Sequence, residues 1–345
     1  MDGTSQILIP IDYEYGFLLL ASAYTPVHAG SGRGYGVVDQ PIQRDTLGYP
    51  EIWSSTIKGS IKSLLMRRIT DKESVKGFLG SEPGEDPTIP GLALLTELTP
   101  IAIPIPSSQY GFLYITTPYL LTKLKNYIEL LKHTNPLESS TNTPELSILK
   151  LKNIEDVINN IFNNIIKNLP NGLDIDQVIA SENIRENEIY ILTTRFKVIK
   201  KFDPGDIDDK IVKLNTLYSY KGVFKNLVVI SDKIGKTIVN SALQIVYRNR
   251  LDRATKTVER GALWSEEYLP YGTLFAGLLL IKNAEVINKM IDDKKGFEKQ
   301  KQAYNRAWKS KNEILKGFNS YVAVGGRETI GKGILKLVLA HIKTP

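Results

Sequence analysis

Glycine occupies every second position from residue 30 to residue 36, inside the stretch HAGSGRGYGVVD at residues 28–39. An apolar run at residues 17–24 precedes this stretch and is typical of a buried strand. Alternating glycines disfavour a helix, and they allow positive φ angles and the close approach of another chain. The dinucleotide-binding fingerprint GxGxxG does not match, because its third glycine would fall on Tyr35 or Val37. We therefore expect an irregular loop, which either binds a ligand or is simply a flexible surface loop.

The composition excludes several classes of protein. The chain has 345 residues, enough for a sizeable core, and no cysteine, so disulfides, zinc ribbons and thiol catalysis are excluded. The N-terminal stretch lacks the pattern of a signal peptide, and the longest apolar runs are too short to cross a bilayer. We expect a soluble protein of the reducing cytoplasm that does not contact a membrane.

The charged residues permit a polyanionic partner without requiring one. The formal net charge is +7, which is compatible with binding to nucleic acid. Histidine occurs only at His28, His133 and His341, and this scarcity disfavours a multi-histidine metal site.

Strand and helix patterns are mixed along the chain, without the strict alternation of βαβ units. Strand patterns occupy residues 17–24, 91–107, 186–199 and 225–233, and helix patterns occupy residues 54–68, 120–133, 144–169 and 284–318. We read residues from about 120 to 175 as a helical insertion on the surface. No linker divides the chain, so we expect a single α+β domain over residues 1–345.

The segment GGRETIGKG near the C-terminus nearly matches a P-loop. Gly326, Gly331 and Lys332 have the required spacing, but Gly333 replaces the Ser or Thr that would hold magnesium. A strand pattern follows where a P-loop would open a helix, so an NTPase is disfavoured. As a strand–loop–strand element, the segment can hold phosphates through Arg327, Lys332 and backbone N–H groups. The alternative is an ordinary hairpin turn.

The helix at residues 54–68 also suits an anion. Ser54 and Ser55 are candidate N-cap residues, and Lys58 and Lys62 lie one turn apart on the same side. Unpaired N–H groups at a helix N-terminus attract anions. The alternative is a capped helix with a solvated lysine face.

A β-hairpin is predicted at about residues 240–268, with a strongly basic end. Arg248 and Arg250 are followed by three more cationic residues before residue 261. A protruding basic hairpin can wedge between nucleotides and contact phosphates. A solvated charged tip is the competing interpretation.

Four motifs, taken in order, resemble the repeated backbone subunit of the type III-B (Cmr) CRISPR effector complex, a member of the RAMP superfamily. They are HAGSGRGYGVVDQPIQRD, SSTIKGSIKS, LWSEEYLPYGTLF and GGRETIGKG, and they anchor both ends of the chain. The resemblance implies an RRM-like (ferredoxin-like) core with an antiparallel sheet, helical insertions and a protruding β-hairpin thumb. It further implies that copies stack in a helical filament on a CRISPR guide RNA, together with other Cmr subunits.

The same resemblance implies antiviral cleavage of complementary single-stranded target RNA at regular intervals, with a divalent metal (Mg²⁺ or Mn²⁺). The family's cleavage aspartate falls on Asp39 and its loop histidine on His28, and its acidic and tyrosine pair falls on Glu266 and Tyr268. Asp39 would accept the 2′-hydroxyl proton or help to hold the metal. His28 would assist or orient the loop, Glu266 would orient the metal or base, and Tyr268 would stack on a flipped nucleotide.

The residues that we expect to bind RNA are mostly cationic or lie in the glycine segments. They are Arg33, Arg44, Ser54, Ser55, Lys58, Lys62, Arg248, Arg250, Gly325, Gly326, Arg327, Gly331, Lys332 and Gly333. The chain departs from the family pattern at Trp53, where a small residue is usual, and at Arg327, where an acidic or amide residue is common. Two alternatives stay open: a non-catalytic structural RNA-binding subunit, and a RAMP endonuclease that processes guides.

Overall fold

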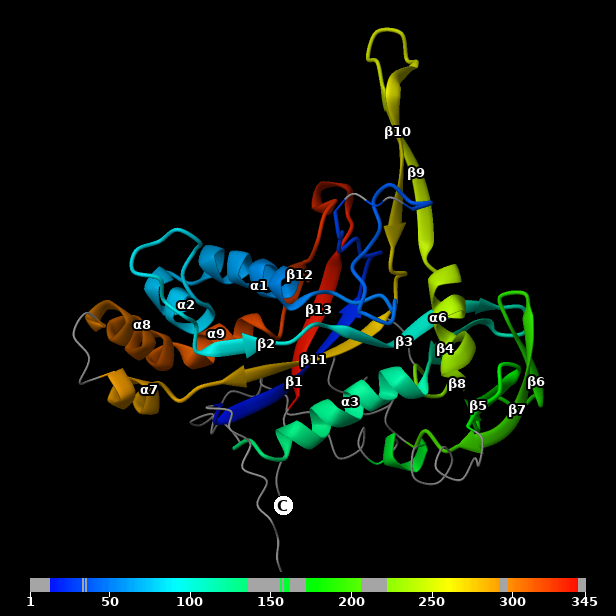
Figure 1. The fold of residues 1–345 in the computed structure, drawn as a ribbon, viewed down its shortest axis with the longest axis horizontal. Coiled ribbons are helices and arrows are strands. Elements are labelled where there is room, and N and C mark those ends of the chain that lie inside the picture. The colour runs from blue at the N-terminus through cyan, green and yellow to red at the C-terminus, as the bar shows by residue number, and fades with distance from the viewer. Residues whose placement is uncertain are drawn as a thin grey trace, which may run out of the picture.

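The computed structural model describes residues 13–32, 34, 36–135, 156, 158–161, 172–205, 222–291 and 297–340. The predicted helix at 144–169 therefore lies mostly outside the described residues. The described chain forms a mixed fold in which a large twisted sheet is covered by several helices (Figure 1). No helix in these ranges combines the length and apolarity that crossing a bilayer requires.

The centre of the sheet is antiparallel. Strand β1 (Tyr15–Ala23) lies between β11 (Leu274–Ile281) and β13 (Ile334–Ala340), and β11 pairs on its other side with β2 (Ala93–Leu95) and β3 (Thr99–Ser107). A short edge strand, β12 (Tyr321–Ala323), pairs with β13. Because side chains on both faces of β1 are buried, its sequence is a nearly continuous apolar run instead of an alternating one.

The other half of the sheet is mixed, so the prediction of an antiparallel sheet fails at two strand pairs there. The strand order continues from β3 through β4 (Gly111–Thr116), β8 (Leu227–Ile230), β5 (Gln177–Ser181), β7 (Thr194–Phe202) and β6 (Glu188–Ile191). The pairs β4–β8 and β5–β7 are parallel. A parallel pair needs a long connection, and each of these pairs is separated in sequence by other elements.

Helices cover both faces of the sheet. One face packs against α1 (Ser54–Arg68), α2 (Lys72–Leu79), α8 (Glu298–Lys309) and α9 (Lys311–Gly317), and the other packs against α3 (Pro118–Leu131). In β1, Leu19 belongs to the first core cluster, whereas Leu18 and Leu20 belong to the second. A third cluster lies under α6 (Asp232–Ser241), in the mixed half of the sheet.

Two helix predictions need correction. The structure divides the predicted helix at 284–318 into α7 (Ala284–Ile291), α8 and α9. The N-cap of α1 is Trp53, which makes no side-chain capping bond, and Ser54 and Ser55 lie inside the first turn. The Oε1 atom of Gln43 instead accepts a hydrogen bond from the backbone N–H of Trp53, at 2.7 Å.

A two-stranded hairpin, β9 (Gln244–Leu251) and β10 (Val258–Tyr268), projects from the body of the molecule (Figure 1). Its tip is ordered by Asp252, whose Oδ1 accepts hydrogen bonds from the backbone N–H groups of Ala254 and Thr255. At its base, β10 leads through a short turn into β11 of the central sheet. The base of the hairpin therefore lies next to the loop that leaves β1, and the candidate site forms there.

Candidate functional site

The glycine loop at residues 28–43 is a return loop, which folds back on itself after β1. The N–H of Gln43 donates to Ala29 O at 2.8 Å, and the N–H of Ser31 donates to Pro41 O at 3.0 Å. A Cβ on Gly30 would lie 3.0 Å from His28 Nε2, and one on Gly34 would lie 2.9 Å from Pro41 Cγ. Gly34 lets the two arms of the loop approach each other closely, whereas a side chain at position 30 would crowd the His28 ring.

The end of this loop pairs with the base of the hairpin. The N–H of Gln40 donates to Ser265 O at 3.0 Å, and the N–H of Glu267 donates to Gln40 O at 3.1 Å. Asp39, immediately before, is exposed, and its Oδ2 accepts hydrogen bonds from Ser265 N and Oγ, both at 2.8 Å. The backbone hydrogen bond from Ser265, followed by the bond from its side chain, lowers the pKa of Asp39. Asp39 is therefore ionised at neutral pH.

Glu266 has no exposed surface and is surrounded by donors and cations. Its Oε1 lies 2.6 Å from both Trp264 Nε1 and Arg327 Nη2, and its Oε2 accepts a hydrogen bond from the Tyr268 hydroxyl and lies 3.7 Å from Arg248 Nη1. Burial alone would raise the pKa of Glu266, but the bonds from Tyr268 and Trp264 and the two guanidinium charges hold it below its ordinary value. This carboxylate organises the base of the hairpin and does not face a substrate.

Tyr268 is also fully buried, which contradicts the prediction that it stacks on a flipped nucleotide. Its ring lies 5.3 Å from the His28 ring and 5.3 Å from Lys332 Nζ. Burial, followed by the hydrogen bond to Glu266, raises the pKa of the Tyr268 hydroxyl. Tyr268 therefore acts as a packing and hydrogen-bonding partner inside the site.

His28 is nearly buried, and its two ring nitrogens have different surroundings. Nδ1 lies 2.8 Å from the backbone oxygen of Glu267. A carbonyl oxygen only accepts, so Nδ1 carries the proton in this contact and Nε2 is the acceptor nitrogen of the neutral ring. Nε2 faces Gly30 and the cleft that His28 lines.

Two arginines that we predicted to bind RNA pair with acidic side chains of the protein. Arg44 Nη2 pairs with Glu267 Oε1 at 2.6 Å. Arg327 Nη2 pairs with Glu266 Oε1 and donates to Gln40 Oε1 at 2.8 Å. Both guanidinium groups keep about a third or less of their side chains exposed, so their main contacts are within the protein. Their first role is to join the glycine loop to the hairpin and to the C-terminal loop.

The C-terminal glycine loop packs closely against the chain after β1. Gly325 has a φ of 78°, and a Cβ there would collide with the backbone oxygen of His28. The N–H of Gly326 donates to His28 O at 2.9 Å, and the N–H of Gly333 donates to Pro26 O at 2.9 Å. The N–H groups of Gly331 and Lys332 also donate to protein carbonyls. Phosphate contacts predicted for this loop would therefore have to use other donors, because these four N–H groups are engaged within the protein.

The remaining predicted cations differ in availability. Lys62 is buried and pairs with Glu82 at 2.8 Å, so it does not face an RNA ligand. Lys58 is half-buried, and burial, followed by the nearby Lys62 charge, lowers its pKa. Arg250 is exposed and pairs with Glu259 at 2.5 Å, and Arg33 lies outside the described residues.

A cleft of about 480 Å³ brings three of the predicted elements together. Its lining comes from the glycine loop, from α1 and from the C-terminal glycine loop, through residues His28, Gly30, Gly32, Gln40, Gln43, Thr56, Gly325 and Gly326. Gln43 joins two of these elements, because its Nε2 donates to Gly30 O at 3.1 Å and to Thr56 Oγ1 at 2.8 Å. Sequence reasoning missed Gln40, Gln43, Ser265 and Glu267, although all four lie within the motifs that carried the resemblance.

Comparison with known proteins agrees with this arrangement. A family model of the RAMP superfamily matches residues 21–336. The chain belongs to the RAMP superfamily. The match includes the end of β1, the glycine loop, the hairpin and the start of β13, so every residue that lines the cleft lies within the RAMP region.

Two curated relatives of this RAMP chain cover nearly its full length. The CRISPR system Cmr endoribonuclease Cmr4 of Pyrococcus furiosus is 29% identical, over 92% of this chain and 93% of the relative. The CRISPR system CMR subunit Cmr4 of Saccharolobus solfataricus is 30% identical, over 96% of this chain and 98% of the relative.

Solved structures also match this chain over nearly its whole length. A chain of the type III-B Cmr-beta complex in the apo state matches with a TM-score of 0.70 and 28% identity, and one from that complex bound to cognate target RNA matches with 0.67 and 26%. Each match covers 95% of this RAMP chain and 98% of the other chain. Oligomeric Cmr4 from Pyrococcus furiosus matches in fold, with a TM-score of 0.56 at 22% identity.

The residues of the RAMP site do not form a metal site on their own. Within the described residues, no group of three or more His, Cys, Asp or Glu side chains is placed to hold a metal ion. Glu266 is enclosed by donors and cations, and Glu267 Oε1 and Oε2 are engaged by Arg44 and by the N–H of Ile42. Asp39 could therefore offer a single carboxylate.

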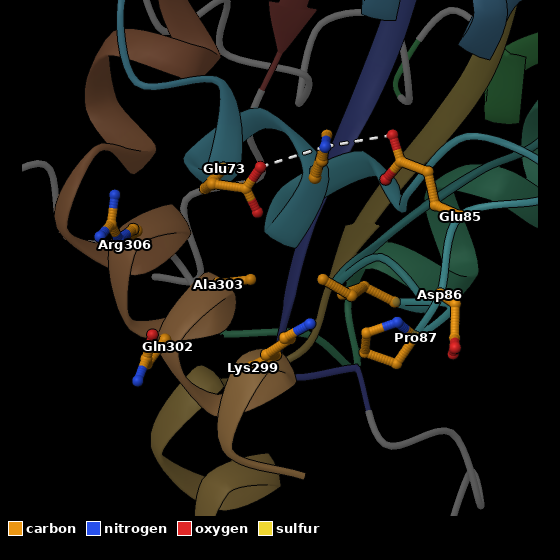
Figure 2. Close-up of a pocket in the computed structure, with 10 residues that line it drawn as sticks. Glu73, Glu85, Asp86, Pro87, Lys299, Gln302, Ala303 and Arg306 are labelled. Atoms are coloured by element: carbon orange, nitrogen blue, oxygen red, sulfur yellow. Dashed lines mark ion pairs between the residues drawn. The ribbon is translucent and has the colours of Figure 1, made fainter.

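A second cleft, of about 380 Å³, lies between α2, the loop after it and α8 (Figure 2). Its one cation on α2, Lys76, pairs with Glu73 and Glu85, both at 3.1 Å. The hydrogen bonds that Lys76 donates to Glu73 and Glu85 raise its pKa. None of the predicted site residues lines this cleft, and α2 and α8 lie on the side of the molecule away from the hairpin (Figure 1).

Proposed function

We propose that this RAMP chain is the guide-RNA-binding backbone subunit of a type III-B CRISPR effector complex and that it cleaves complementary target RNA at regular intervals. The observation that carries the proposal is the full-length match to Cmr4 relatives, one of them named an endoribonuclease, and to chains of the Cmr-beta complex with and without target RNA. Its partners are then a CRISPR guide RNA, single-stranded target RNA, other Cmr subunits and further copies of itself in a helical filament.

The order of elements supports a ferredoxin-like, RRM-like core. The strands β13, β1, β11 and β2 are adjacent in this order and antiparallel. Helices α1 and α2 connect β1 to β2, and α7 to α9 lie between β11 and β13. This is the connectivity of a βαββαβ unit in which long insertions separate the second and third strands.

The β9–β10 hairpin has the two faces that a thumb acting on a duplex needs. Strand register places exposed Ile245, Tyr247, Leu251 and Val258 on one face, and Arg248 and Arg250 on the other. Apolar and aromatic side chains stack against bases, while arginines bind phosphates. We therefore assign the hairpin to the thumb that interrupts the guide–target duplex.

Asp39 is the residue that we assign to the cut. In RNA cleavage by the neighbouring 2′-hydroxyl, an O2′–P bond forms, the P–O5′ bond breaks, the carboxylate takes the 2′-hydroxyl proton, and the leaving O5′ takes a proton from solvent. Asp39 is exposed and ionised, at the end of a loop that borders the cleft. His28 Nε2 borders the same cleft and would accept a hydrogen bond from the substrate.

Dependence on Mg²⁺ or Mn²⁺ is part of the proposal, with one constraint from the structure. Because Glu266 and Glu267 are engaged by donors and cations, Asp39 is the carboxylate of this site that could bind a metal, and the RNA and water would supply the other ligands. Glu266 and Tyr268 are assigned to the support of the loop, because both are fully buried.

A reconstituted complex with a defined guide tests the proposal. The complex should cut a labelled complementary RNA at a constant spacing and leave a scrambled RNA intact, and a new guide should redirect the cuts to its own complement. Binding without cutting would support the structural subunit, and cutting of the guide repeat by the isolated chain would support the guide-processing enzyme. A fixed sequence preference across guides would contradict the proposal.

A further inference from the structure

Ser265 and Asp39 are joined by three hydrogen bonds. Ser265 N and Oγ both donate to Asp39 Oδ2 at 2.8 Å, and Ser265 Oγ accepts from Asp39 N at 3.0 Å. Ser265 is buried on β10, whereas Asp39 is exposed. Among the residues that the structure describes, no side chain other than that of Ser265 donates to this carboxylate.

The loop before Asp39 offers little support of its own. A Cβ on Gly36 would meet nothing within 4 Å, and Val37 is 94% exposed. A carboxylate at the end of such a segment would otherwise sample several staggered rotamers. The two bonds from Ser265 select one orientation, in which Oδ2 is occupied and Oδ1 is the oxygen that remains for the substrate.

The same strand also holds the backbone next to Asp39. Gln40 pairs with Ser265 and Glu267 through two backbone hydrogen bonds, and its side chain accepts from Arg327, which is itself paired with the buried Glu266. The end of the loop thus forms a parallel β-bridge with β10, between Gln40 and Glu266. The Asp39 carboxylate is therefore attached to the base of the hairpin through both side-chain and backbone hydrogen bonds.

We propose that Ser265 is a positioning residue, which holds the Asp39 carboxylate against the base of the β9–β10 hairpin so that both act on the target RNA as one rigid unit. The inference rests on the proposed function, in which Asp39 takes the 2′-hydroxyl proton. It explains how a cut is kept at a fixed distance from the thumb, since one strand carries both the hairpin and the clamp on the carboxylate.

The test compares Ser265→Ala and Ser265→Thr in the assembled complex, by single-turnover cleavage at saturating target RNA. Ser265→Ala should cut about 10- to 100-fold more slowly, because a small misplacement of a reacting group is costly. The affinity for target RNA should not change, since phosphate contacts are elsewhere. Ser265→Thr keeps the hydroxyl and should restore most of the rate. Ser107→Ala, a buried serine on β3, is the matched control.

Asp39→Ala separates this inference from the proposed function. If Asp39→Ala does not cut and Ser265→Ala cuts at the wild-type rate, the positioning role is wrong and the function stands. If Asp39→Ala cuts at the wild-type rate, the proposed role of Asp39 fails and the positioning role fails with it. A slower rate in Ser265→Ala that arises wholly from weaker target binding would also overturn the inference. The double variant should be no slower than Asp39→Ala alone.

Discussion

Replacing Glu266 with glutamine should destabilise the free protein more than its position on a projecting hairpin suggests. The substitution keeps the shape of the side chain but removes the charge between Arg327, at 2.6 Å, and Arg248, at 3.7 Å. It also places an amide N–H₂ among donors from Trp264 and Tyr268. Removal of one partner from a buried pair costs about 3–5 kcal/mol. Because both guanidinium groups keep about a third of their surface in water, we expect a smaller loss than this, about 2–3 kcal/mol.

The hairpin supplies its own control. Glu259 pairs with Arg250 at 2.5 Å, but both side chains are exposed, so Glu259→Gln should cost less than about 1 kcal/mol. Urea unfolding of the RNA-free chain, with wild type and both variants side by side, measures the difference. Equal midpoints for the two variants would refute the view that the Glu266 network stabilises the base of the hairpin.

Acid pH should remove the stability that the ionised Glu266 carboxylate contributes. The native pKa of Glu266 is held below its ordinary value, so its stabilisation is present above the unfolded pKa, about 4.3, and is lost as the pH falls through the native pKa. The difference in free energy of unfolding between wild type and Glu266→Gln should therefore be roughly constant from pH 5 to 7. It should shrink below about pH 4.3. A stability difference that grows as the pH falls would show that the expected direction of this pH dependence is wrong.

Three further predictions concern RNA binding, the divalent metal and the side chain of Lys123. Lys58→Ala should weaken RNA binding equally for all sequences and reduce the salt dependence, with a slope of about −0.7 per phosphate contact in single strands, whereas salt-independent binding would contradict phosphate contacts. Removal of divalent metal with EDTA should stop cleavage but not guide binding, and cleavage at an undiminished rate in EDTA would exclude a metal requirement. Lys123→Met should lower the free energy of unfolding in urea by about 2–3 kcal/mol, because it leaves the buried carboxylates Asp45 and Glu51, at 3.1 and 3.5 Å, without their cation; an unchanged free energy of unfolding would show that these carboxylates find other partners.

Local sequence patterns predicted the strand and the helix whose buried side chains leave a regular apolar pattern in the sequence. The apolar run before the glycine loop became β1, and the stripe of Ile57, Ile61, Leu64 and Leu65 became the buried face of α1. Both signals exist because a buried face imposes its period on the sequence. The hairpin lies at Gln244–Tyr268, where the sequence alternates before a polar tip, although no face of β9 is buried.

The roles of individual charges could not be predicted, because their partners are distant in the chain. Arg44 pairs with Glu267, 223 residues later, and Lys62 pairs with Glu82 in the loop after α2. From sequence alone, each cation reads as available for phosphate. Burial of Tyr268 was hidden for the same reason, because only the fold brings His28 and Lys332 against its ring.

The most direct test of the account is single-turnover target cleavage by a complex assembled with Asp39→Asn. Asparagine keeps an oxygen that can accept from Ser265 N and Oγ, so assembly, guide binding and target capture should be unchanged. Loss of the charge should slow the cut by about 10²- to 10⁴-fold, as expected for a positioned acid or base. Asp174→Asn, which removes an exposed carboxylate far from the hairpin in sequence and paired only with Lys233 at 3.3 Å among the described residues, should cut normally. Cleavage by the Asp39→Asn complex at the wild-type rate and at the same positions would contradict the assignment and leave this chain as an RNA-binding scaffold.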